Sequence, residues 1–251
     1  MKGNKGKIIT FASTKGGIGK TIAVLNFAAT YGKLGYKVLI IDLDVYSGAI
    51  ATSINSENEK SIYNVIDDLS NNRFEEIAPY TYKYNELIDI ISSPRDPRLA
   101  NKIDSKFIPM IFDNVKYKYD IILIDTSHLL DEINIITIDH SDLVFYMFSN
   151  DIFDLKNTRS FFSIVKDVGM DHVYAVLNAS IGRSFFSDFA IRNIIKRDID
   201  YVLSPNLYVG SIDKYLLEGE LLLLNRKLKS KKAYKELAII ATSLLEKIGD
   251  K

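Results

Sequence analysis

The sequence predicts an α/β protein with a doubly wound, mostly parallel sheet that is flanked by helices. Short runs rich in isoleucine and valine recur along the 251 residues and are separated by segments with helical periodicity. That alternation is typical of a parallel sheet covered on both faces. A glycine-rich segment follows the first run directly, and carboxylates or amides follow several of the others. Because ligands of such sheets bind beyond the carboxyl ends of the strands, we expect the functional residues there.

The predicted elements alternate along the whole chain. We expect strands over residues 8–12, 37–42, 87–91, 120–125, 143–149, 172–178 and 200–204. We expect helices over residues 20–34, 61–70, 104–115, 131–139, 154–168, 187–197 and 230–248. Gly35 stands where a C-terminal helix cap favours glycine. No linker rich in proline, glycine or serine and no internal repeat divides the chain, so residues 1–251 are expected to form one domain.

The composition narrows the class of protein. Hydrophobic residues make up 47% of the chain and charged residues 25%, as in ordinary globular proteins. The 32 basic residues balance the 32 acidic ones, so only local basic patches could bind nucleic acid. Cysteine is absent from the sequence, which excludes disulfides, thiolate metal sites and thiol catalysis. We find no signal-peptide pattern and no apolar segment of the ~20 residues that a membrane span needs. We therefore expect a cytoplasmic protein that reaches a membrane peripherally or through a partner.

The glycine-rich segment at residues 15–21, KGGIGKT, has the context of a phosphate-binding loop. It lies between a predicted strand and a predicted helix, where backbone N–H groups and a helix N-terminus can cradle phosphate oxygens. Lys20 suits the β- and γ-phosphates, and Thr21 suits Mg²⁺. Thr14 replaces the first glycine of the usual motif, and Lys15 is a second lysine that such a loop does not need.

Carboxylates stand at two predicted strand ends. Asp42 and Asp44 lie two residues apart, where the alternation of a strand would point both to one side. Such a pair can serve Mg²⁺ and an attacking water. Asp125 ends the buried run at residues 119–126, YDIILIDT, as in a Walker B strand that binds Mg²⁺. The alternatives are a solvated acidic turn for the first two residues and a helix cap for Asp125.

The spacing of residues 15–21 resembles the deviant Walker A loop of the ParA/MinD family of P-loop ATPases. The resemblance implies ATP and Mg²⁺ as ligands, and a homodimer with ATP sandwiched at its interface, in which Lys15 touches the nucleotide of the other subunit. It also implies that Asp44 orients or activates the hydrolytic water while Asp42 supports the metal site. Asn178 and the Pro205-Asn206 segment resemble the family's adenine contacts, although Leu207 replaces an aspartate there.

Three sets of site residues follow from the motifs and the resemblance. The expected catalytic residues are Lys15, Lys20 and Asp44. The expected nucleotide contacts are Lys15, Gly16, Gly17, Ile18, Gly19, Lys20, Thr21, Ile22, Asn178, Pro205 and Asn206. The expected metal ligands are Thr21, Asp42 and Asp125. The expected reaction is slow, partner-stimulated hydrolysis of ATP to ADP and phosphate, in which positioning and charge stabilisation do most of the work.

Three branches of the resembled family compete for the cellular task. The segments at 125–128, DTSH, and 154–159, DLKNTR, most resemble the CpaE/TadZ branch, which positions pilus or secretion machines. A partition ATPase would bind nonspecific DNA through basic runs such as those at 192–197 and 226–232. A MinD-like division ATPase would lay an amphipathic helix on the membrane. Residues 233–247 have an apolar stripe, but packing on the sheet explains it more simply.

Two further alternatives concern the chemistry. A pseudo-ATPase could hold nucleotide as a fixed dimer scaffold without hydrolysing it, although the presence of both loop lysines, Thr21, Asp44 and Asp125 favours an active enzyme. His128 could serve as a base, but a lone histidine is more often structural. The three histidines of the chain do not share metal-ligand spacing.

Overall fold

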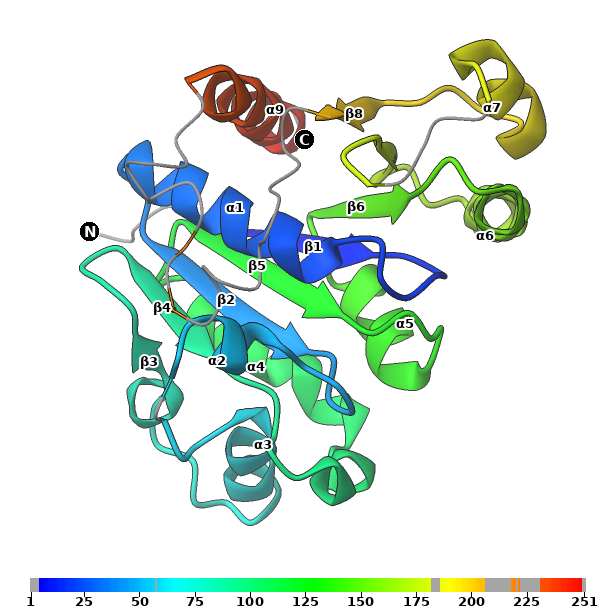
Figure 1. Ribbon diagram of the computed structural model, residues 1–251. Helices are drawn as coiled ribbons and strands as arrows, with labels where there is room; N and C mark the ends of the chain where they lie inside the picture. The colour runs from blue at the N-terminus through cyan, green and yellow to red at the C-terminus, as the bar shows by residue number, and fades with distance from the viewer. Residues whose placement is uncertain are drawn as a thin grey trace.

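The computed structural model describes residues 5–56, 58–181, 186–205, 218–219, 221 and 231–249. Its centre is an eight-stranded sheet in the order β3-β4-β2-β5-β1-β6-β7-β8 (Figure 1). The strands are β1 (Lys7–Ala12), β2 (Val38–Leu43), β3 (Tyr82–Lys83), β4 (Ile88–Ile91), β5 (Ile121–Thr126), β6 (Leu143–Phe148), β7 (Val173–Asn178) and β8 (Tyr201–Leu203). Every neighbouring pair is parallel except β3 and β4. The predicted fold class is therefore confirmed.

Helices cover both faces of this sheet (Figure 1). The α-helices are α1 (Lys20–Lys33), α2 (Ile50–Ser53), α3 (Ile62–Ser70), α4 (Ile108–Val115), α5 (Glu132–Asp139), α6 (Ile152–Asp167), α7 (Asp188–Ile195) and α9 (Lys231–Gly249). Short 3₁₀ helices, η1 (Ala78–Tyr80), η2 (Pro97–Lys102) and η3 (Ser105–Phe107), join some of them. One buried cluster packs α1 and α9 against one face of the sheet. Two others pack α3, α4 and α5, and then α6 and α7, against the opposite face.

The middle strands are mostly apolar because both of their faces are covered. Every residue of β2, β5 and β6 is buried, as parallel strands between two helical layers require. On the α1 face, the rings of Phe11 and Phe145 lie 5.1 Å apart, and Phe27 of α1 lies 5.3 Å from Phe11. These contacts fix α1 over β1, so the loop between them has a rigid base.

The sheet order places β1 between β5 and β6. The chain leaves β1 for β2 on one side and later reaches β6 on the other side, so β1 lies where the winding direction reverses. In doubly wound sheets, the crevice at this reversal, beyond the carboxyl ends of the strands, is the usual ligand site. The loop that follows β1 opens at that position.

The seven predicted strands all occur, and each boundary lies within one residue of the prediction. Gly35 has a φ of +92°, as its predicted capping role requires. The helix predicted over 104–115 is instead divided into η3 and α4, with Pro109 in the first turn of α4, where its missing N–H is tolerated. The helix predicted from Asp154 begins at Ile152. Neither β3 nor α2 was predicted.

Helix α9 packs its apolar side on the body of the protein. Leu237, Ala241 and Leu244 are almost completely buried, and the Tyr31 hydroxyl of α1 donates a hydrogen bond to the Ala241 carbonyl at 3.1 Å. Ile239, on the outer side, is 70% exposed. The apolar stripe is thus explained by packing against α1. Among the helices that the structure describes, none is long and apolar enough to cross a membrane.

Candidate functional site

The predicted phosphate-binding loop joins β1 to α1 at the carboxyl edge of the sheet (Figure 1). Gly17 and Gly19 have φ angles of +73° and +85°, a region of backbone space that favours glycine. The Ser13 hydroxyl donates to the Lys15 carbonyl at 3.0 Å and so ties the start of the loop to its middle. The loop leads directly into the N-terminus of a 14-residue helix, which is the arrangement that suits an anion.

Lys20 and Thr21 point from the first turn of α1 into this edge. The Lys20 ammonium is largely buried and donates to the Ser13 hydroxyl at 2.8 Å. Burial lowers the pKa of Lys20, while the negative charges of Asp125 and Asp44 oppose that shift. The Thr21 hydroxyl donates to Oδ2 of Asp125 at 2.6 Å. The lysine and the hydroxyl that a phosphate loop needs are therefore bonded into the same cluster as the predicted Walker B aspartate.

Asp42 and Asp125 form a buried acid pair. They face each other in the parallel register of β2 and β5, and their exposed fractions are 0% and 1%. Asp42 accepts hydrogen bonds from the N–H of Asp44 at 3.1 Å, the N–H of Ile50 at 3.3 Å and the hydroxyl of Ser93 at 3.1 Å. Oδ1 of Asp125 is buried and has no hydrogen-bond partner. The pair thus has more acceptor capacity than the surrounding protein satisfies.

Burial raises the pKa of both carboxyl groups. The pKa of Asp125 rises to about 6, although the Thr21 hydrogen bond and the Lys20 charge act in the opposite direction. The pKa of Asp42 is raised by burial first and by the charge of Asp125 second. Removing a carboxylate from water is costly unless an opposite charge compensates it. A bound cation at this edge would supply that compensation.

The oxygen ligands present fit Mg²⁺, and they are few. Carboxylate and hydroxyl oxygens from Asp42, Asp125 and Thr21 are the hard donors that this ion prefers. In the described part of the chain, no group of three or more His, Cys, Asp or Glu side chains could hold a metal ion. Mg²⁺ commonly takes one or two protein carboxylates and completes its shell with phosphate oxygens and water. The residues therefore fit an ion that arrives with a nucleotide.

Asp44 differs from its buried neighbour Asp42. It lies in the loop after β2 and is partly exposed. Its carboxylate accepts from the Ser47 hydroxyl at 3.0 and 3.2 Å through its two oxygens. A partly solvated carboxylate that is anchored by a single serine can reach a water molecule at this edge. The two acids therefore have separate environments, as their predicted separate roles require.

Lys15 is bonded within its own chain. Its Nζ lies 3.3 Å from Oδ1 of Asp151, and both side chains are roughly two-fifths exposed. Asp151 is also the N-cap of α6, where it accepts from the N–H of Phe153 at 3.0 Å and of Asp154 at 3.2 Å. Sequence reasoning missed Asp151 because it began the helix at Asp154. The available signal was an aspartate one residue before an apolar helical segment.

The residues predicted to contact adenine are only partly described. The Asn178 amide donates to the Ile18 carbonyl at 2.8 Å, and its oxygen accepts from the Ser180 hydroxyl at 2.6 Å. Asn178 therefore joins the end of β7 to the phosphate-binding loop, and its contact with a base stays a prediction. Pro205 follows β8 and is exposed. Asn206 lies outside the described residues, as does Leu207.

Three more residues shape the site. A Cβ atom at Gly48 would lie 2.0 Å from Oγ of Ser93 and 2.5 Å from Oδ2 of Asp42, so no side chain fits there. Neither Gly48 nor Ser93 was among the predicted site residues. His128 is exposed and lies near the phosphate-binding loop, where a Cβ atom at Gly16 would lie 3.7 Å from its Nδ1. Its place in the cluster suits contact with the loop rather than a metal.

A family model matches most of the chain. The model is described as an AAA domain (AAA_31) and matches residues 6–182. Among curated proteins, an uncharacterised protein of Methanocaldococcus jannaschii, MJECL24, is 25% identical over 64% of this chain and 66% of its own length. The septum site-determining protein MinD of Helicobacter pylori is 22% identical over 63% of this chain and 58% of its own length. The chain thus spans less than two thirds of the length of these relatives.

Solved structures share the fold over nearly the full chain. A ParA family ATPase from Chlorobium tepidum has a TM-score of 0.81 at 18% identity, with 94% of this chain and 98% of that chain covered. The septum site-determining protein MinD from Pyrococcus horikoshii, solved in complex with Mg-ADP, has a TM-score of 0.75 at 22% identity, with 95% of each chain covered. The eight-stranded sheet and its helical layers are those of these ATPases.

Proposed function

Because this chain belongs to the AAA domain family whose model matches residues 6–182, and has the fold of the ParA/MinD ATPases, we propose that it is a Mg²⁺-dependent ATPase. In this proposal it dimerises on binding ATP and acts as a spatial-positioning switch. The observation that carries the proposal is the 2.6 Å bond between Thr21 of the phosphate-binding loop and Asp125 of the buried acid pair. It joins a phosphate cradle to a buried carboxylate whose other oxygen has no hydrogen-bond partner.

The proposed reaction is transfer of the terminal phosphoryl group to water. Lys20 contacts the β- and γ-phosphates, since its ammonium is already fixed beside Ser13 at the base of the loop. Thr21, Asp42 and Asp125 hold Mg²⁺, which supplies charge neutralisation at the phosphates when bound. Asp44 orients the attacking water or accepts its proton. Positioning and charge stabilisation account for most of the rate enhancement in such reactions.

The proposed dimer places a second copy against the nucleotide edge. Lys15 then leaves Asp151 and touches the nucleotide of the other subunit. Large apolar side chains near this edge support the proposal, because Leu129, Leu130 and Phe153 are 49%, 43% and 73% exposed. The two leucines follow β5, and Phe153 lies two residues after Asp151. Apolar side chains gathered beside a binding site are typical of surfaces that a partner covers.

The proposed task is to position a pilus or secretion machine, in the manner of the CpaE/TadZ branch. The support is the resemblance after Asp125, together with the position of His128 near the phosphate-binding loop, where a Cβ atom at Gly16 would lie 3.7 Å from its Nδ1. In this proposal the segment after β5 senses the state of that loop. A MinD-like task is an equal alternative on the similarity to MinD proteins. The burial of the apolar side of α9 on α1 does not favour insertion of that side into a membrane.

A partition ATPase that binds nonspecific DNA is the second candidate. A hollow between α6 and α7 is lined by four basic side chains, Arg159, Lys166, Lys196 and Arg197. Basic side chains gathered in this way suit contact with phosphates. Two arginines predicted for this role form ion pairs within the chain. Arg192 lies 3.3 Å from Asp198, and Arg197 lies 2.8 Å from Asp200. These carboxylates partly neutralise the positive charge that would attract DNA. Residues 226–230 of the second predicted basic run lie outside the described residues.

The central experiment traps the ATP-bound state. Asp44→Ala is expected to bind ATP and accumulate as a dimer, because binding is retained while the water is no longer positioned. Light scattering with Mg-ATP, and with Mg-ADP as the comparison, measures the mass. Lys20→Ala is the control and should remain monomeric with either nucleotide. An Asp44→Ala protein that binds ATP and stays monomeric would contradict the dimer mechanism.

Phosphate release distinguishes an active ATPase from a dimer scaffold that holds nucleotide without hydrolysing it. The wild-type protein is expected to release phosphate slowly from Mg-ATP, and Asp44→Ala should abolish the release. A wild-type dimer that forms with ATP but releases no phosphate, with or without its partner, would support the scaffold. Capture of the trapped Asp44→Ala dimer from its own cells then tests the task. Pilus or secretion components support the first proposal, whereas salt-sensitive binding to arbitrary DNA supports partition.

A further inference from the structure

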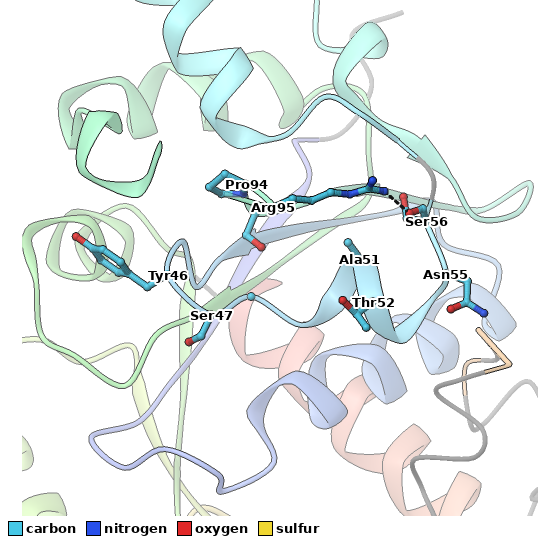
Figure 2. A pocket seen from close by; sticks show the side chains of 10 residues that line it. Tyr46, Ser47, Ala51, Thr52, Asn55, Ser56, Pro94 and Arg95 are labelled. Atoms are coloured by element: carbon cyan, nitrogen blue, oxygen red, sulfur yellow. Dashed lines mark hydrogen bonds between the residues drawn. The ribbon is translucent and has the colours of Figure 1, made fainter. Parts of the chain in front are cut away.

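A cavity lies beside the acid pair, on the side away from the phosphate-binding loop. Its volume is about 480 Å³, and its walls come from the loop after Asp44, from α2 and from the segment that follows β4. Figure 2 shows the side chains around it, with Thr52 on α2 and Arg95 extending along the wall toward Ser56. No residue of the loop at 13–21 lines this cavity. Its volume is in the range of small-molecule sites.

The wall of the cavity is rich in hydroxyl groups and has one cation. Hydroxyls from Ser47, Thr52, Ser56 and Ser93 line it with Arg95, and among the residues that the structure describes no acidic side chain does. Ser56 and Ser93 are both more than nine-tenths buried. Of the hydroxyls on this wall, those of Ser47 and Ser93 donate to Asp44 and Asp42, so each can donate to a ligand only by turning away from its aspartate. Such a wall suits an anionic ligand better than an apolar or a cationic one.

The guanidinium of Arg95 is mostly unused by the protein. Nη2 donates to the Ser56 carbonyl at 2.8 Å, and within the described ranges Arg95 meets no carboxylate. By contrast Arg98, three residues later, is bonded by both carboxylate oxygens of Asp96. A guanidinium has five N–H donors in a planar fork that matches phosphate and carboxylate groups. Arg95 therefore keeps most of this capacity for a ligand.

We propose that this cavity binds a small organic anion, with its phosphate or carboxylate group on Arg95 and its remaining polar groups on the surrounding hydroxyls. Phosphate and carboxylate are the two anionic groups that the planar fork recognises through paired hydrogen bonds. The cavity is larger than a single anionic group, so the rest of the molecule also contacts the wall. This site is separate from the nucleotide site.

Occupancy of the cavity acts on Asp42 and Asp44 through two serines. Ser47 donates to Asp44 at 3.0 Å, and Ser93 donates to Asp42 at 3.1 Å. A ligand that takes either hydroxyl changes the hydrogen bonding of one of these aspartates. The bound anion thus regulates ATP hydrolysis. This regulatory part rests on the proposed function, whereas binding at Arg95 does not.

The test measures binding while the phosphate-binding loop is removed from competition. Calorimetric titrations use the Lys20→Ala protein and three probes, namely inorganic phosphate, ribose 5-phosphate and succinate. We expect one molecule of ribose 5-phosphate or succinate to bind at millimolar concentration or below. Inorganic phosphate should bind more weakly than ribose 5-phosphate, because it reaches fewer of the hydroxyls. Preference for the sugar phosphate or for succinate tells which anionic group the site takes.

Variants of Arg95 in the same background decide the outcome. Arg95→Gln should weaken binding by at least about tenfold, since it removes the charge-assisted bonds. The affinity of Arg95→Lys should lie between those of the parent protein and Arg95→Gln, because lysine keeps the charge but not the planar fork of donors. Arg98→Gln is the matched control and should bind as the parent protein does. Absence of saturable binding for all three probes, or binding that Arg95→Gln leaves unchanged, would overturn the proposal.

The regulatory part has its own readout. Addition of the binding probe to wild-type protein should change the rate of phosphate release at saturating Mg-ATP, and Arg95→Gln should remove that response. Binding without an effect on the rate would overturn the coupling through Ser47 and Ser93 and would leave the site itself established. A wild-type protein without ATPase activity would instead count against the proposed function.

Discussion

Asp42 and Asp125 are the two carboxylates on which the proposed cation site depends. Each is buried, and each has a pKa that burial raises. In an ordinary core, apolar side chains would fill these positions, as they do in the rest of β2 and in residues 121–124 of β5. Two carboxylates at one edge therefore cost stability in the free protein. That cost is offset when a cation binds between them.

The raised pKa of Asp125 gives a pH-dependent stability. A carboxyl group with a higher pKa in the folded than in the unfolded protein contributes stability that is complete below about pH 4 and is lost as the pH rises through about 6. Asp125→Asn should therefore raise the free energy of unfolding of the ligand-free protein at pH 7 by about 1–3 kcal/mol. Urea denaturation at about pH 4.5 and at about pH 7, which lie near the lower end of that window and above its upper end, measures the free energy of unfolding.

The control for this prediction is Asp139→Asn, because Asp139 is exposed at the end of α5. It should change the pH dependence little. If Asp125→Asn is less stable than wild type at neutral pH in the absence of Mg²⁺ and nucleotide, the description of the acid pair as destabilising is wrong. Added Mg²⁺ with nucleotide should narrow the difference, because the wild-type carboxylate then has its cation.

Lys15 and Asp151 give the second prediction at the scale of residues. Asp151→Asn removes the charge that holds Lys15, and the asparagine still caps α6. Stability should change little, because exposed ion pairs contribute little. ATP-dependent dimerisation should be tighter, because Lys15 no longer leaves a partner when it crosses to the second subunit. Sedimentation equilibrium with Mg-ATP measures the dimer constant.

Asp151→Ala is the companion variant, since it removes the cap as well as the charge. Tighter dimerisation in Asp151→Asn with reduced stability only in Asp151→Ala would separate the two roles of this residue. An unchanged dimer constant in Asp151→Asn would mean that Lys15 is not restrained by Asp151. Lys15→Ala in either background should bind ATP without forming a stable dimer.

The candidate site was predictable where chemistry follows from the local sequence. Lys20, Thr21 and Asp125 belong to patterns with a fixed spacing, and the structure brings them together. The contacts of Ser93 with Asp42 and of Asp151 with Lys15 were not predictable, because the partners lie 51 and 136 positions apart in the chain. A serine or an aspartate alone gives no indication of such a distant contact. The separate environments of Asp42 and Asp44 also depend on the turn after β2, which strand alternation does not describe.

At the scale of elements, the long apolar runs were predicted well and the short elements were not. The strands β2, β5 and β6 are buried on both faces, so their apolar runs are continuous and their ends are sharp. β3 has two residues and α2 has four, which is too few to show a period. Their positions are set by the strands and loops on which they pack. The start of α6 was misread because one aspartate, Asp151, caps the helix and a second, Asp154, stands in its first turn.

Helix α9 provides a prediction about an element. Leu244 is 0% exposed against the α1 side, whereas Ile239 is 70% exposed. Leu244→Ala should lower the free energy of unfolding by about 2–4 kcal/mol, because it leaves a cavity in the core. Ile239→Ala, the matched control on the same helix, should lower it by less than about 0.5 kcal/mol. Thermal and urea unfolding of both variants measure the difference.

The same two variants test the MinD-like alternative. If α9 inserts into a membrane, binding to vesicles with anionic lipids should depend on Ile239, the apolar side chain that faces outward. Vesicle sedimentation with the Asp44→Ala protein, with and without Ile239→Ala, would show it. No binding of the ATP-trapped dimer to such vesicles would remove direct membrane insertion by this helix.

At the scale of the whole molecule, the site is a product of topology. β1, β2, β5, β7 and β8 are separated along the chain, yet parallel pairing brings their carboxyl ends to one edge. This convergence was the strongest inference available from the sequence, because it needed only the alternation of strands and helices. The strand order could not be predicted from the same pattern. It depends on which crossovers reverse direction around β1.

Nucleotide binding should stabilise the whole molecule. At about 100 times the dissociation constant, Mg-ADP is expected to raise the free energy of unfolding by about 2.7 kcal/mol, which corresponds to a rise in Tm of roughly 5–10 °C for a chain of this size. Thermal unfolding at several concentrations of Mg-ADP measures it. Lys20→Ala should abolish the shift, whereas Lys118→Ala, an exposed residue at the opposite edge of the sheet, should keep it. A full shift in Lys20→Ala would place the nucleotide elsewhere.

Gly48 and Ser93 are 45 positions apart, but they occupy a single space, because a Cβ atom at 48 would meet Oγ of Ser93 at 2.0 Å. Such positions cannot vary independently during evolution. A lineage that gains alanine at 48 must reduce the side chain at 93 at about the same time, or lose the geometry of Asp42. Related sequences should therefore show joint replacement at these two positions. In the laboratory, Ser93→Gly should rescue only part of the damage that Gly48→Ala causes, because a Cβ atom at 48 would still lie 2.5 Å from Oδ2 of Asp42.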